Sequence, residues 1–353
     1  MEIQKGFNRI KGIRKILIIN LGGIGDVLLS TPAIRALKSL FSQATISVMV
    51  VPRVYEIIND SSYIDEAFIF HKSATKIFKN IKILLILRKR HFDLAINMRT
   101  LATKKSAKKI KFLLNIINPR IKMGRDTEGR GYFFDIKIPE TDIGKFEMEY
   151  DIDAVRALGG DVVDRSIDFN INKTHLEKVN KLLEKERVPE NGVLIGIHPG
   201  GKPCHRWPLK NFTKVIDKLH KEISCKFVIT GGKEELKLAS KLMKITADAK
   251  MINLAGRLNI KELGALIKRC NLFISNDTGP MHVATILKTP LIAIFGPGCI
   301  KRYDPRYISD KAIVLYKKIE CAPCERVTCD SMGCLKAILP EEVSETALRL
   351  LMH

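Results

Sequence analysis

Short apolar runs alternate with longer amphipathic stretches along the first half of the chain. The runs 15–20 and 92–97 are short and mostly apolar, which is typical of buried strands. The stretches 73–90 and 103–117 combine apolar and basic positions in the manner of helices that bury one face. Strands that alternate with helices in this way predict a parallel sheet covered by helices.

The second half of the chain repeats this alternation from about residue 190. A strand pattern at 226–232 follows a helix pattern at 209–223, and further pairs come after them. A chain of 353 residues is long for a single hydrophobic core. We therefore expect an α/β protein with two Rossmann-like domains, 1–188 and 189–338, and a terminal helix within 339–353.

The composition is that of an ordinary globular protein, with 46% hydrophobic and 28% charged residues. No apolar run reaches the roughly 18 residues of a transmembrane helix. The charged N-terminus is not followed by an apolar region of the signal-peptide type. These features predict a cytoplasmic protein.

The net charge is +22 and is distributed unevenly. Residues 67–134 contain 17 lysines and arginines but only three acids, which gives this segment a charge of +14. The electrostatic field of so large a positive charge favours nucleic acid, anionic lipid or a phosphorylated substrate as partner. The alternative is a solvated basic surface, enriched in lysine by an AT-rich genome.

The first loop, 20–31, has the sequence NLGGIGDVLLST between a predicted strand and a predicted helix. Its three glycines suggest a phosphate loop, but Asp26 at the helix start would repel a phosphate. Asp26 is either an N-terminal capping residue or a carboxylate presented as a base. Pro32 lies early in the helical stretch, and we expect the regular helix to begin there.

Four loops in the second half follow predicted strands, where doubly wound sheets bind their ligands. In the loop 275–284, Asp277, Thr278 and Gly279 open a helix whose N–H groups can bind an anion, and His282 lies one turn further. The loop 198–208 adds three basic residues, which are Lys202, His205 and Arg206.

The loop 229–235 contains Gly231 and Gly232, which allow close approach of a ligand, and two acids. Glu235, or its neighbour Glu234, can accept ribose hydroxyls or simply start a helix. The loop 295–298 follows the fourth of these strands. Together the four loops predict a site for a nucleotide diphosphate.

Several sequence blocks occur in one order between about residues 14 and 345. They are GGIGDVLLSTPAIRALK, IHPGGKPCHRWPLKNF, VITGG, NLAGRLNIKELGALIKRCNLFISNDTGPMHVA, TPLIAIFGPG and CAPC. In this combination the chain resembles glycosyltransferase family 9, the lipopolysaccharide heptosyltransferases.

The resemblance implies a GT-B fold, in which two Rossmann-like domains face each other across a cleft and the terminal helix packs back on the first. It also implies inverting, metal-independent transfer from a nucleotide sugar, typically ADP-heptose, to a lipid A–Kdo acceptor. Asp26 then matches the general base of the family, and the loop Asp277–Gly279 with His282 matches its donor diphosphate site. The protein would be peripheral at the inner face of the inner membrane.

One position departs from the family pattern. The family has a lysine two residues before the Trp-Pro pair, and this chain has His205 there, while Lys202 or Arg206 can substitute. We expect this difference to affect the turnover rate and the identity of the donor. That the protein is an inactive relative of the family is a less favoured alternative.

The basic segment 67–134 falls in the expected acceptor domain. Its cations are candidates for holding an acceptor with phosphates or Kdo carboxylates, and the helix 73–90 is a candidate for lying on an anionic membrane. The candidate acceptor residues are Gly23, Gly25, Arg99, Lys104, Lys105, Arg120 and Arg125.

Four cysteines near the C-terminus are spaced C-x2-C-x4-C-x4-C, at Cys321, Cys324, Cys329 and Cys334. In a cytosolic chain this pattern suggests a structural zinc or an iron–sulfur cluster, with reduced thiols as the alternative. No cofactor is expected to be needed for catalysis.

Two other function classes stay open. One is another GT-B enzyme, either a transferase or an epimerase, that uses a UDP- or GDP-sugar. The other is a non-enzymatic polyanion-binding protein. No recognised nucleic-acid motif is present in the sequence, so nucleic acid is not expected as a partner.

Overall fold

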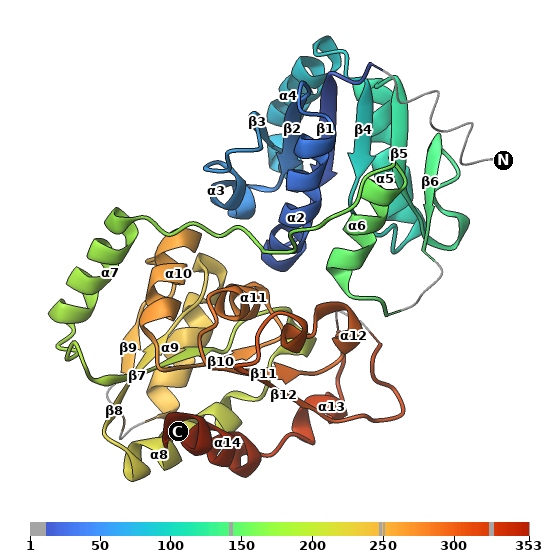
Figure 1. Cartoon of the computed structure of the whole chain (residues 1–353). Helices are drawn as coiled ribbons and strands as arrows, with labels where there is room; N and C mark the ends of the chain where they lie inside the picture. Colours follow the sequence, from blue (N-terminus) through green and yellow to red (C-terminus); the bar gives the residue numbers. More distant parts are fainter. Residues whose placement is uncertain (1–11, 141–143, 247–248, 250, 325–327, 353) are drawn as a thin grey trace. The chain divides into compact units, whose positions relative to one another are not determined.

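The computed structural model describes residues 12–140, 144–246, 249, 251–324 and 328–352 (Figure 1). The chain divides between Asp168 and Phe169 into two compact units, each built on its own six-stranded sheet. Every strand pair in both sheets is parallel, as the alternating pattern predicts.

The first unit has the strand order β3-β2-β1-β4-β5-β6. Its strands are β1 (Lys15–Asn20), β2 (Thr45–Val50), β3 (Glu66–Ile69), β4 (Leu94–Asn97), β5 (Ile121–Asp126) and β6 (Ile136–Pro139). Its helices are α2 (Ile24–Leu40), α3 (Tyr55–Ile58), α4 (Ile77–Lys89), α5 (Lys104–Ile117) and α6 (Glu147–Arg156). The order reverses between β1 and β4, which makes the carboxyl ends of these two strands the expected ligand position.

The second unit repeats this topology with the order β12-β11-β10-β7-β8-β9. Its strands are β7 (Val193–His198), β8 (Cys225–Ile229), β9 (Met251–Asn253), β10 (Leu272–Asn276), β11 (Leu291–Phe295) and β12 (Ala312–Tyr316). Its helices are α7 (Lys173–Lys185), α8 (Leu209–Glu222), α9 (Leu236–Ile245), α10 (Ile260–Arg269), α11 (Gly279–Ile286), α12 (Ile300–Tyr303), α13 (Gly333–Lys336) and α14 (Pro340–Met352). The corresponding reversal lies between β7 and β10.

Helix α2 begins earlier than the sequence predicts. It starts at Ile24 and carries Pro32 in its interior, so the expectation that the regular helix begins at Pro32 is wrong. A proline there cannot donate to the carbonyl four residues earlier, that of Leu28. The Thr31 hydroxyl donates to this carbonyl at 2.8 Å and so replaces the missing bond.

Helix α7 explains why the chain divides earlier than the boundary at 188 expected from the sequence. It buries Val179 and Leu183 and packs against α10, and Lys178 pairs with Glu262 of that helix. The segment 169–188 therefore belongs to the second unit.

Terminal helix α14 packs on α8 and buries Val343 and Ala347 in the core of the second unit. The predicted separation of residues 339–353 from that core is therefore not seen, while packing of this helix on the first domain stays a prediction. Within the described residues, no helix combines the length and apolar character needed to cross a membrane.

Candidate active site

The loop between β1 and α2 holds Asp26 against its own backbone. The Asp26 Oδ2 atom accepts the N–H of Gly23 at 2.6 Å, as an acid in a first helical turn does. A Cβ atom on Gly22 would lie 2.5 Å from the Asp26 Cβ, so glycine is required at that position. Gly25 lies within the first turn of α2 and is buried.

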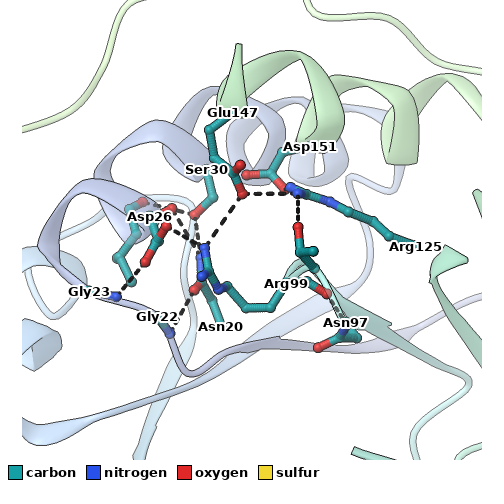
Figure 2. A network of polar contacts seen from close by, with 12 residues as sticks. Asn20, Gly22, Gly23, Asp26, Ser30, Asn97, Arg99, Arg125, Glu147 and Asp151 are labelled. Atoms are coloured by element: carbon teal, nitrogen blue, oxygen red, sulfur yellow. Dashed lines mark hydrogen bonds and ion pairs between the residues drawn. The ribbon is translucent and has the colours of Figure 1, made fainter. Parts of the chain in front are cut away.

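Asn20, at the end of β1, supports this loop from below (Figure 2). Its amide nitrogen donates to the Asp26 carbonyl at 3.1 Å and to the Ser30 hydroxyl at 3.2 Å, and its oxygen accepts the Gly22 N–H at 3.1 Å. The sequence analysis missed this residue. The signal for it is a polar side chain that ends an otherwise apolar strand.

Arg99 reaches Asp26 from the loop after β4, across the point where the strand order reverses (Figure 2). Its guanidinium forms an ion pair with Asp26 Oδ1, and the same Nη1 atom lies 3.5 Å from Glu147 Oε1. Both oxygens of the Asp26 carboxylate are therefore held, one by a backbone N–H and one by Arg99. The predicted role of Arg99 in acceptor binding stays untested.

Arg125, in β5, shares the Glu147 carboxylate with Arg99 and is fully buried, so its side chain is not exposed to bind an acceptor as the sequence predicts. Its guanidinium donates to Glu147 at 2.9 Å and to Asp151 at 2.5 Å, and these carboxylates project from α6 (Figure 2). Burial raises the pKa of Asp151 to about 7, against the lowering effect of Arg125. Two carboxylates thus hold the buried Arg125, while its Nε atom is buried without a hydrogen-bond partner in the described structure.

The other predicted acceptor cations lie in different places. Lys104 and Lys105 are exposed in the first turn of α5, which follows β4 and so begins at the edge where Asp26 lies. Arg120 precedes β5 and lies 3.7 Å from Asp93, which precedes β4. In a parallel sheet this is the opposite edge, so the structure does not bring Arg120 to the site.

Two further cations, Arg53 and Lys72, lie near the loop of Asp26. The Arg53 guanidinium would lie 3.4 Å from a Cβ atom placed on Gly23. Burial lowers the pKa of Lys72, and the charges of Arg53, Lys109 and Arg99 lower it further. Within the described part of the chain, no ion pair with a carboxylate is found for Arg53, Lys72 or Lys109.

In the second unit, Glu235 joins two glycine loops. Its Oε1 atom accepts the Gly201 N–H at 2.6 Å, and its Oε2 atom accepts the Gly232 N–H at 2.8 Å. A Cβ atom on Gly200 would lie 1.9 Å from Oε1. The buried carboxylate thus holds the loops together, while the neighbouring Glu234 is exposed and its carboxylate lies beside Gly232.

His205 and Asp277 meet where the loops after β7 and β10 come together. His205 Nδ1 lies 3.5 Å from Asp277 Oδ2, and both side chains are nearly buried. His205 Nε2 is buried and has no hydrogen-bond partner within the described structure. Such an unsatisfied group is costly unless a ligand pairs with it.

The Asp277 carboxylate is also fixed from its other side. A Cβ atom on Gly298 would lie 2.2 Å from Asp277 Oδ2, so the third glycine loop fits closely over the pair. Asp277 therefore orients His205 from behind.

The start of α11 lies in the same loop as Asp277. Thr278 precedes the helix, but its hydroxyl lies 3.3 Å from the Asn276 carbonyl and does not cap it, and Gly279 is the first helical residue. His282 is buried, with its ring 5.7 Å from that of Tyr303. A helix start of this kind is suited to an anion.

The remaining predicted cations flank the loop after β7. Lys202 is exposed, and Arg206 Nε donates to the Gly201 carbonyl at 2.7 Å. Asn276, which the sequence analysis missed, ties the two loops by donating to the Gly200 carbonyl at 3.0 Å and accepting the Trp207 N–H at 3.1 Å. It stands, like Asn20, at the end of a buried strand.

The four-cysteine segment shows mixed burial. Cys321 is exposed and Cys334 is packed in the core of the second unit, and residues 325–327 between them lie outside the described part. Among the residues that the structure describes, no three suitable side chains are arranged to hold a metal ion. The zinc or iron–sulfur prediction is therefore without structural support.

Comparison with known proteins identifies relatives over most of the chain. Residues 81–335 match the family model "Glycosyltransferase family 9 (heptosyltransferase)". Lipopolysaccharide heptosyltransferase 3 of Escherichia coli is 27% identical over 284 residues, which cover 77% of this chain and 80% of that protein. Lipooligosaccharide heptosyltransferase 2 of Campylobacter jejuni is 26% identical over 345 residues, with 94% and 96% covered.

Solved structures of similar fold are also found. A family 9 glycosyltransferase from Veillonella parvula has a TM-score of 0.77 and 23% identity, with 96% of this chain and 97% of that chain covered. At this identity the likeness bears on the fold alone. The two parallel sheets and these neighbours confirm the predicted α/β class and the GT-B fold.

Proposed function

Because the chain belongs to glycosyltransferase family 9, we propose that it transfers a heptose, or a related sugar, from ADP-heptose to a lipopolysaccharide inner-core acceptor of the lipid A–Kdo type. The names of its relatives, lipopolysaccharide and lipooligosaccharide heptosyltransferases, support the sugar and the acceptor. The single observation that carries the chemistry is the Asp26 carboxylate fixed at the strand-order reversal of the first sheet.

In the proposed reaction, Asp26 removes the proton of the acceptor hydroxyl as its oxygen attacks the anomeric carbon. The bond from that carbon to the donor diphosphate breaks, ADP leaves with the electron pair, and the anomeric configuration inverts. The start of α11 and the cations of the loop after β7 stabilise the charge on the leaving diphosphate. No metal is needed for these steps.

The acceptor of this proposal is acidic, since Kdo carries a carboxylate and lipid A carries phosphates. Lys104 and Lys105 stand at the Asp26 edge of the sheet, and Arg53 and Lys72 lie near the Asp26 loop. Such cations can hold carboxylates or phosphates. For the donor nucleoside, Gly231, Gly232 and the exposed Glu234 are the proposed contacts, with Glu235 holding the loops.

Thermal-shift measurements with ADP-, UDP- and GDP-sugars test the donor. We expect ADP-heptose to raise the Tm most, and mass spectrometry to detect heptose transfer to Kdo2–lipid A that a chelator does not reduce. Stabilisation by a UDP- or GDP-sugar alone would favour the other GT-B enzymes. Salt-sensitive binding of polyanions without any sugar-nucleotide binding would favour a non-enzymatic protein.

His205 is proposed to donate its Nε2 proton to a donor phosphate, with Asp277 behind it. We expect His205→Ala to weaken ADP-heptose binding about 10- to 100-fold in calorimetry, since a hydrogen bond to a charged group is lost. His205→Lys should retain most of the affinity, because an ammonium can serve both partners. His220→Ala, an exposed histidine of α8, is the matched control. Wild-type affinity in His205→Ala would exclude the phosphate role.

Two further parts of the proposal concern location and metal. The lipid-linked acceptor favours a cytoplasmic enzyme at the inner face of the inner membrane, with an anionic membrane surface as partner. A structural zinc or iron–sulfur cluster at the four cysteines stays a prediction, which elemental analysis of the purified protein tests.

A further inference from the structure

Helix α4 presents an apolar face to solvent. The exposed fractions are 55% for Ile77, 83% for Phe78, 46% for Ile81 and 51% for Leu85. Residues at these spacings lie on one side of an α-helix, within about one third of its circumference. Large apolar side chains gathered on a helix face are unusual on a protein surface, unlike single exposed ones.

The same helix also has an inward face that accounts for its packing. Leu84 and Leu87 are buried, and α4 packs against α5, the neighbouring helix in the first unit. The four exposed residues are therefore not needed to attach α4 to the sheet. Phe112 adds a fifth exposed apolar side chain on α5.

Cations border the apolar face, and α4 contains no acidic residue. The exposed basic residues of this helix and its ends are Lys76, Lys79, Lys82, Arg88, Lys89 and Arg90. An apolar face flanked by lysine and arginine is typical of helices that lie in the interface of an anionic membrane. Two copies of this face would repel each other, whereas anionic headgroups complement it.

The topology sets the direction of α4 relative to the candidate site. The helix connects the carboxyl end of β3 to the amino end of β4, so Ile77 and Phe78 lie toward the edge of the sheet that carries Asp26. Lys72, whose pKa is lowered by burial and by the charges of Arg53, Lys109 and Arg99, lies in the segment between β3 and α4. The start of α4 and Lys72 thus both lie toward the edge of the sheet that carries Asp26.

We infer that the outward face of α4, made of Ile77, Phe78, Ile81 and Leu85, inserts into the interface of an anionic lipid bilayer. The inference rests on the proposed function, which places the acceptor in a membrane. It adds the surface by which the enzyme reaches that acceptor. Docked in this way, the helix presents the Asp26 edge to a headgroup-level acceptor.

Flotation with vesicles of phosphatidylcholine, with and without phosphatidylglycerol, tests the inference. We expect the full chain to bind only the vesicles that contain phosphatidylglycerol, and to be released by salt. The double variant Phe78→Ser/Ile81→Ser should bind at least about tenfold more weakly, because two large apolar side chains no longer leave water. Lys79→Glu/Lys82→Glu should weaken binding to the anionic vesicles in the same way.

Val163→Ser is the matched control, since Val163 is 98% exposed and lies outside α4 in the first unit. It should bind the vesicles as the wild type does. Equal binding by Phe78→Ser/Ile81→Ser and wild type would overturn the inference. So would a change in that variant's sedimentation mass without a change in vesicle binding, since the face would then join two copies.

The outcome can be separated from failure of the proposed function. ADP-heptose stabilisation measured without vesicles reports the donor site alone, and Phe78→Ser/Ile81→Ser should leave it unchanged. Transfer to a water-soluble, deacylated acceptor should also be unchanged in this variant, while transfer to acceptor embedded in vesicles falls. If no sugar nucleotide binds, the proposed function is wrong. The vesicle assay then still decides whether α4 binds the membrane.

Discussion

Asp26→Asn is expected to reduce the kcat of heptose transfer by about 10²- to 10⁴-fold, the usual contribution of a general base, and to leave donor affinity unchanged. Asparagine has the same shape but cannot take a proton from the acceptor hydroxyl. The loops proposed to bind the donor belong to the second unit, whereas Asp26 belongs to the first. Steady-state transfer assays measure kcat, and calorimetry of donor binding measures the affinity separately.

The ion pair with Arg99 makes a control necessary. Both Asp26 oxygens accept, one from Gly23 and one from Arg99, and an asparagine can accept with only one of them. Part of any loss could therefore come from a displaced Arg99. Asp93→Asn is the matched control, because the Asp93 carboxylate accepts the Arg14 and Lys15 N–H groups at the opposite edge of the same sheet.

We expect Asp93→Asn to lower the Tm at least as much as Asp26→Asn does, and to leave kcat within a few-fold of wild type. Transfer by Asp26→Asn at a rate near that of the wild type would exclude Asp26 as the base. An equal loss of kcat in both variants would mean that a distorted first sheet, and not the loss of the proton acceptor, lowers the rate.

Much of the fold follows from local signals in the sequence. The predicted strand at 15–20 agrees with β1, and the helix expected at 103–117 differs from α5 by one residue at its start. Periodicity and loop residues report such elements because both act over a few neighbouring positions. The start of α2 does not follow from such signals, since the hydroxyl that replaces the bond lost at Pro32 belongs to Thr31 and leaves no mark on the hydrophobic pattern.

Part of the candidate site could also be predicted from the sequence, and part of it could not. The loops of Asp26 and Asp277 could be located from the sequence because parallel strands end at one edge. The burial of Arg125 could not, because its partner Glu147 lies 22 residues later, on the helix that follows β6. Glu235 looked like a ribose ligand for the same reason, since the Gly201 N–H that occupies it comes from another strand's loop.

Arg125→Met is expected to lower the free energy of unfolding of the first unit by about 3–5 kcal/mol, the usual cost of removing one partner from a buried ion pair. Methionine fills a similar volume but leaves Glu147 and Asp151 without their cation. Hydrogen exchange of peptides that contain β5 and α6 reports this unit. Trp207 fluorescence reports the second unit and should not change.

The pH dependence distinguishes an unpaired buried charge from a simple packing defect. The pKa of Asp151 is already raised from 3.8 to about 7 in the folded state, and loss of Arg125 would raise it further. A group with a raised folded pKa contributes its stability below its unfolded pKa and loses it as the pH rises. Wild type and Arg125→Met should therefore lose this stability in parallel up to about pH 7, and the deficit of the variant should grow only above that pH.

Arg120→Met provides the matched control for this prediction. Arg120 is half exposed and lies 3.7 Å from Asp93, so its removal should change the stability by no more than about 0.5 kcal/mol, with little dependence on pH. A deficit in Arg125→Met that does not grow above about pH 7 would point to lost packing alone. A deficit as small as that of Arg120→Met would mean that water reaches Glu147 and Asp151, and that Arg125 does not hold these carboxylates in place.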